Sequence, residues 1–151
     1  MPFVNSRFSD FSPAFGNGDY SELFFTSTRE GGVSNKIDDR TGESFVDVWF
    51  TELDKKGLWS RPIVLQEPIN TEGNEGSIYL NNRGTVMYLT QCKVEKKKAL
   101  GCGIYVSERK GKSWGATQLL QLKVPDNTNL GHPALSEDEN ILIFSSDLAG
   151  G

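Results

Sequence analysis

The stretch LFFTS at residues 23–27 recurs as MYLTQ at residues 87–91 and as LIFSS at residues 142–146. Each copy is short, begins with three apolar residues, and is flanked by turn-forming residues, which is typical of a β-strand. A strand that is largely apolar along its length is expected to be covered on both faces. The recurrence of one such strand indicates a repeated structural unit.

Further matched runs surround each copy. Upstream of the three copies lie SPAF at residues 12–15, SIYL at 77–80 and HPAL at 132–135. Downstream of the first two copies lie VWFTE at 48–52 and IYVSE at 104–108. These are followed by GLWS at 57–60 and KSWG at 112–115, and then by residues 63–65 and 119–122. Four short antiparallel strands in each repeat are the signature of a propeller blade. We therefore predict an all-β fold, a partial β-propeller made of four-stranded antiparallel blades. The blades are expected at residues 9–67 and 76–124, with the start of a third at 131–151.

Composition narrows the classes of function. The 151 residues carry a formal net charge of −4, which gives no electrostatic footprint for nucleic acid. No stretch approaches the roughly 20 apolar residues that cross a bilayer, so no membrane insertion is expected. Two complete repeats and part of a third do not close a ring. We therefore expect this sequence to be cut from a longer chain, or several copies to associate through open blade edges.

The third repeat carries a family resemblance. Residues 131–139, GHPALSEDE, followed by LIFSSD at 142–147, resemble the WD40-like β-propeller repeat of TolB-type periplasmic proteins. Within that group the chain looks most like OmpA-family peptidoglycan-associated lipoproteins of the Bacteroidota type IX secretion system, through residues 5–13, 88–92 and 100–107. Neither full repeat has the Pro-Asp-Gly turn of the family, so the geometry of those turns departs from its pattern.

The resemblance implies a function without catalysis and without a cofactor. It implies a periplasmic, outer-membrane-associated scaffold domain that binds envelope proteins of a secretion or outer-membrane complex. Two alternatives remain open at this point. A sialidase-like carbohydrate-active propeller would need a cluster of arginines facing a common channel, and the propeller gate of a serine peptidase would need a hydrolase domain in the same gene.

The two cysteines, Cys92 and Cys102, lie at the expected end of one strand and the expected start of the next. If that hairpin pairs as the repeat implies, with residues 93–101 as its loop, their side chains face each other at disulfide distance. A chain that resembles periplasmic proteins favours a disulfide over free thiols. The alternative is two buried thiols in a cytosolic protein.

The residues that carry chemistry elsewhere form no coherent catalytic set. His132, the single histidine, occupies a repeat position and is expected to be structural. Residues 107–114, SERKGKSW, resemble the Asp-box of sialidases with Arg109 in the aspartate position, and that box is a structural turn. The arginines Arg7, Arg29 and Arg40 do not occupy equivalent strand positions, which argues against a sialidase site.

Two long loops between strands are the candidate partner-binding elements. Residues 31–45 form an acidic and polar insertion, and residues 93–101 form a lysine-rich loop. Oxygen-bearing side chains in the first loop do not follow a regular calcium-binding spacing, so we expect a solvated loop and no metal site. Loops on a rigid scaffold commonly bind partners. Both loops are expected on one face, with these candidate contacts: Asp38, Asp39, Arg40, Lys96, Lys97 and Lys98.

Overall fold

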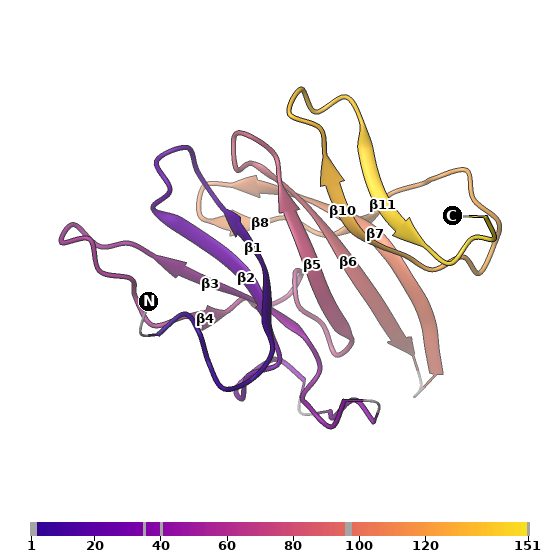
Figure 1. Cartoon of the computed structure of the whole chain (residues 1–151), viewed down its shortest axis with the longest axis horizontal. Coiled ribbons are helices and arrows are strands. Elements are labelled where there is room, and N and C mark those ends of the chain that lie inside the picture. Colours follow the sequence, from indigo (N-terminus) through magenta and orange to yellow (C-terminus); the bar gives the residue numbers. More distant parts are fainter. Residues whose placement is uncertain (1–2, 35, 40, 96–97, 151) are drawn as a thin grey trace.

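The computed structural model describes residues 3–34, 36–39, 41–95 and 98–150. The described chain contains β-strands and no helix, which confirms the all-β prediction (Figure 1). The first antiparallel sheet runs in the order β1 (Asp10–Phe15), β2 (Glu22–Ser27), β3 (Asp47–Glu52) and β4 (Ile63–Val64). β2 carries the apolar run Leu23–Phe25 and lies in the middle of this sheet, where it is buried along almost its whole length.

The second and third sheets repeat this arrangement. The five-stranded sheet contains β5 (Asn74–Leu80), β6 (Val86–Glu95) and β7 (Lys98–Lys110), with β8 (Ser113–Trp114) and β9 (Gln118–Leu119) both paired to β7. The last sheet is the hairpin of β10 (Leu130–Leu135) and β11 (Leu142–Ser146). The recurrent runs LFFTS, MYLTQ and LIFSS therefore lie in β2, β6 and β11, each paired with the strand before it.

The first strand of each sheet carries the same irregularity. Register shifts occur between Phe11 and Ala14 in β1, between Glu75 and Ile78 in β5, and between Gly131 and Ala134 in β10. Such a bulge inserts one unpaired residue and bends the strand. The three sheets thus share a backbone deviation as well as a sequence pattern.

The sheets are stacked side by side, with β5 between β1 and β10 (Figure 1). The main core fills the space between the first and second sheets, and its fully buried members include Phe24 and Val48 on one side and Met87 and Leu89 on the other. A smaller cluster of Val4, Leu23, Phe25 and Trp49 covers the opposite face of the first sheet. Burying apolar area between sheets that cannot cover themselves is the main force that holds such stacks together.

A buried asparagine fixes the segment that connects the first two sheets to the first of them. The Asn70 side chain accepts a hydrogen bond from Val48 N at 2.8 Å, and donates to Val48 O at 2.9 Å and Leu65 O at 2.6 Å. Its side chain is fully buried. Asn5 stands at the matching position of the repeat, before the first sheet, and is exposed.

The hairpin of β6 and β7 differs from the expectation. A nine-residue loop at 93–101 was expected, but pairing continues past Cys92 and Cys102 to Val94 opposite Ala99 and Glu95 opposite Lys98. The hairpin therefore extends beyond the cysteines and has a shorter turn than expected. The fourth strands are shorter than the runs that predicted them, since β4 and β9 each contain two residues.

The outward face of the third sheet is uncovered in this structure. Ile143 on β11 is 62% exposed, whereas Phe24, at the matching position of the first sheet, is 1% exposed. The difference arises because the first sheet has a neighbour on that side and the β10–β11 hairpin has none among the described residues.

Candidate functional site

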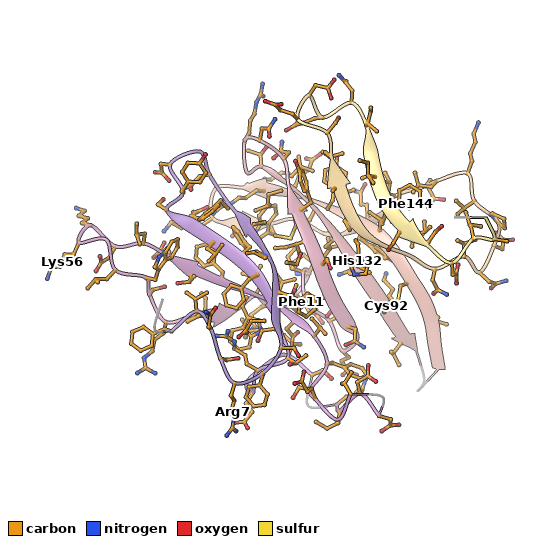
Figure 2. The ribbon with its side chains drawn as sticks, in the orientation of Figure 1. Arg7, Phe11, Lys56, Cys92, His132 and Phe144 are labelled. Carbon is orange, nitrogen blue, oxygen red and sulfur yellow. A yellow bond between two sulfur atoms is a disulfide. The ribbon has the colours of Figure 1, made fainter. Side chains whose placement is uncertain are left out.

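A groove of about 1000 Å³ opens where the three sheets meet at one end. Its walls come from the loop between β2 and β3, from the start of β5, from the β6–β7 hairpin and from β10 and β11. Figure 2 shows three of its lining residues, Phe11, His132 and Cys92, on three different sheets. A concave site shared between several rigid elements is the usual place for binding in a protein of this kind.

Hydrogen bonds join neighbouring sheets beside the groove. Ser12 Oγ accepts from Ile78 N at 3.0 Å, which joins β1 to β5. Thr90 Oγ1 accepts from His132 N at 3.0 Å, which joins β6 to β10. Ser12 and His132 occupy the same position of the repeat and both adopt a left-handed backbone, with φ of 51° and 53°. This conformation is uncommon for residues other than glycine. It directs the hydroxyl of Ser12 toward β5 and the backbone N–H of His132 toward β6.

The side chain of His132 hydrogen bonds to Ser145. His132 Nδ1 lies 2.9 Å from Ser145 Oγ, and Ser145 Oγ lies 3.0 Å from Gly131 O. A hydroxyl has one proton, so Ser145 Oγ donates either to Gly131 O or to His132 Nδ1, according to the tautomer of the imidazole. The pair joins β10 to β11 beside the groove.

The disulfide between Cys92 and Cys102 lies in the wall of the groove. The two residues are directly opposed in the β6–β7 register, with Cα atoms 4.0 Å apart and sulfur atoms 2.03 Å apart. The predicted bond is therefore confirmed. Disulfides of this kind persist in oxidising compartments, so the bond indicates an environment outside the cytoplasm.

The two predicted partner-binding segments reach the same groove. Asp38 and Asp39 of the β2–β3 loop line it on one side, and Lys93 of the β6–β7 hairpin lines it on another. Arg40, Lys96 and Lys97 lie outside the described residues, and Lys98 is the first residue of β7. Their part in binding stays a prediction.

The β2–β3 loop has internal structure. Ile37 forms a bridge with Ser44, and the hydroxyl of Thr28 donates to Glu43 Oε2 at 2.6 Å. Glu43 is thereby turned toward the end of β2. The described part of the chain contains no group of three or more His, Cys, Asp or Glu side chains placed to hold a metal ion.

Two buried carboxyl groups beside the groove were not predicted from the sequence. Glu75 in β5 lines the groove and is 0% exposed, and Asp47 at the start of β3 is 1% exposed. Burial, together with the nearby charge of Asp47, raises the pKa of Glu75 to about 7. Hydrogen bonds from Thr71 favour the ionised form and partly offset this rise. Burial raises the pKa of Asp47 to about 6. The repeat contains one signal for Glu75, because Asp10 stands at the matching position of the first repeat. The backbone N–H of Thr71 donates to the Glu75 carboxylate, and that of Ser6 donates to the Asp10 carboxylate, four residues later in both cases.

The arginines of the described chain are dispersed. Arg109 forms two hydrogen bonds with Glu22, of 2.6 and 2.9 Å, and so joins β7 to β2. Arg29 is paired with Asp10 at 2.6 Å, and the exposed Arg7 with Glu30 at 3.0 Å. Arg109, which stands in the aspartate position of the Asp-box-like stretch, therefore joins two sheets. None of these three arginines lines the groove.

Comparisons with models of protein families, with curated proteins and with solved structures gave no match. No helix able to span a membrane occurs in the described residues.

Proposed function

We propose that the three stacked sheets are successive blades of a β-propeller. Four observations support this: a four-stranded antiparallel sheet, its near-repetition in the second sheet, the matching bulges in β1, β5 and β10, and the lateral contact of these first strands. In a propeller the first strands line the central axis and the outer strands lie at the rim. The uncovered face of Ile143 is where a further blade would pack.

We further propose that the chain is a scaffold that binds a protein partner outside the cytoplasm, without catalysis. The observation that carries this proposal is the convergence of the β2–β3 loop and the β6–β7 hairpin on one groove between rigid sheets. A partner bound there would contact elements of all three sheets at once. The disulfide and the resemblance of residues 131–147 to TolB-type repeats favour the periplasm and an envelope complex, such as one that serves secretion or the outer membrane.

The test compares two charge-reversal variants with equal changes in net charge. The groove variant carries Asp38→Lys and Asp39→Lys; the control carries Asp126→Lys and Glu137→Lys, at exposed positions that do not line the groove. Each is used as bait with a native envelope extract, and the retained proteins are identified by mass spectrometry. We expect one set of envelope proteins to bind the native chain and the control but not the groove variant.

Two outcomes would overturn the proposal. Equal recovery of the same envelope proteins with both variants would show that the groove does not bind them. Retention of glycans or peptides alone, with turnover of a sialoside or peptide substrate, would replace the scaffold with an enzyme.

A further inference from the structure

Asp47 anchors the first end of the β2–β3 loop. Its Oδ2 accepts a hydrogen bond from Val33 N at 3.0 Å, and Gly32 packs directly against the same oxygen. Its Oδ1 is buried and has no hydrogen-bond partner. The loop is therefore tied down by a carboxyl group that lies out of water and is only half satisfied, which is a costly arrangement for an ionised acid.

The second end of the same loop is fixed to β5, next to Glu75. Val46 N donates to Asn74 Oδ1 at 2.9 Å, and Glu75 N donates to Val46 O at 2.8 Å. Among the described residues, Thr71 alone donates to the Glu75 carboxylate, at 3.0 Å from N and 2.6 Å from Oγ1. The two ends of the loop thus each depend on a segment that contains a buried acid.

No cation compensates these two acids among the described residues. Asp47 pairs with Ser27, and Ser27 pairs with Asp10, in the register of the first sheet. Arg29, two residues after Ser27, forms its ion pair with Asp10. Lys36 within the loop is paired with Glu72 at the surface. Gln91, which faces Glu75 across the β5–β6 pair, is neutral. Asp47 is the charged group that acts on Glu75, and it does so by repulsion.

The two acids differ in how easily they reach water. Glu75 lies within β5, paired to β6 along its length. Asp47 is the first residue of β3, beside a loop that holds two consecutive glycines, Gly31 and Gly32. Moving the loop away from β3 exposes Asp47 without breaking a sheet, whereas exposing Glu75 requires the two sheets to separate.

We propose that the β2–β3 loop is a proton-dependent lid on the groove, held down while at least one of Asp47 and Glu75 is protonated and released when both ionise. Release removes one of two like charges from a buried site and hydrates it. The loop residues that line the groove move with it, so the groove is narrow in mildly acidic solution and open in alkaline solution. The raised pKa values of both groups place the change between about pH 6 and pH 7.

Hydrogen–deuterium exchange of the full chain with its disulfide intact tests the lid. Exchange at pH 5.5 and pH 8, corrected for the intrinsic change in rate, is followed in peptides from the β2–β3 loop and from the β6–β7 hairpin. We expect protection of the loop to fall at least about tenfold at pH 8 while the β6–β7 amides stay protected, since local opening leaves the core intact.

Three variants test whether ionisation of the two buried acids causes the loop to open. Asp47→Asn still accepts from Val33 N but cannot ionise, so its loop should stay protected at pH 8. Glu75→Gln should do the same by removing the repulsion, and it serves if Asp47→Asn does not fold. Glu137→Gln removes an exposed acid that neither lines the groove nor contacts the loop, and it should keep the native response. Loop protection that does not change with pH, an unchanged pH response in both buried-acid variants, or parallel loss of the β6–β7 protection would each overturn the proposal.

Discussion

Replacing Asn70 with alanine tests how the first two sheets are joined. The substitution removes three hydrogen bonds of 2.6 to 2.9 Å to Val48 and Leu65. Val48 O keeps a second donor, Leu65 N, but Val48 N loses its partner in a buried site. A neutral hydrogen bond contributes about 1 kcal/mol net, and a stranded buried donor costs about 1–3 kcal/mol. The two lost bonds to carbonyl oxygens and the stranded Val48 N–H together lead us to expect that Asn70→Ala lowers the free energy of unfolding by about 3–5 kcal/mol.

The repeat supplies a matched control for this change. Asn5→Ala is the same substitution at the equivalent position, where the side chain is exposed, and it should change stability by less than about 0.5 kcal/mol. Urea unfolding followed by tryptophan fluorescence measures both, because Trp49 and Trp114 lie in or against the two cores. Similar stabilities for Asn70→Ala and the native chain, or similar decreases in the free energy of unfolding for both variants, would refute the role of Asn70 in fixing the connecting segment.

Three further outcomes follow from the same structure. Replacing Cys92 and Cys102 with serine should lower the free energy of unfolding by about 2–3 kcal/mol, because the bond closes a short loop in the unfolded chain. Raising the pH from 5 to 8 should also lower it. The pKa of Glu75 is about 7 in the folded state against an ordinary 4.5, so the stability is complete below pH 4.5 and is lost as the pH rises through 7. A shift of that size corresponds to about 3 kcal/mol, and Glu75→Gln should remove most of the slope. Arg109→Met should cost about 3 kcal/mol by leaving the Glu22 carboxylate mostly buried and unpaired.

Each of these outcomes has a control measured by the same urea titration. The cysteine variant is compared with the native chain under oxidising and reducing conditions, and equal stabilities under both would contradict the estimate. For the pH slope, Glu72→Gln should leave it unchanged because Glu72 is exposed. For the ion pair, Lys112→Met breaks an exposed pair with Glu52 of 3.8 Å and should cost less than about 1 kcal/mol. A cost equal to that of Arg109→Met would show that burial of the Arg109 pair does not matter.

The strands were predictable where apolar residues recur in strand-like runs. The runs at 23–27 and 87–91 are strands with largely buried side chains, and the run of apolar residues in the sequence indicates that burial directly. The run at 142–146 is also a strand, although its outward face is uncovered in this structure. The disulfide was predictable for a related reason, since two cysteines in facing strands of one hairpin come within bonding distance once the strands pair.

Other features were beyond the reach of a single sequence. The extended β6–β7 hairpin was missed because polar and lysine-rich residues of 93–101 are equally compatible with a loop. Glu75 and Asp47 were missed because burial of a charged residue depends on which sheet packs above it, and local pattern carries no such information. The pairing of Arg109 with Glu22 joins residues that are 87 positions apart, so only the stacking of the sheets brings them together.

These polar contacts have a role that the apolar core cannot fill. Hydrophobic burial between stacked sheets is non-directional, so it favours contact but does not by itself fix how far one sheet slides past the next. Directional bonds between Ser12 and Ile78 and between Arg109 and Glu22 set the position of the second sheet against the first. The groove takes its walls from all three sheets, so its shape depends on the same bonds. A variant such as Arg109→Met that stays folded should therefore bind the proposed partner more weakly, although its substituted side chain lies outside the groove.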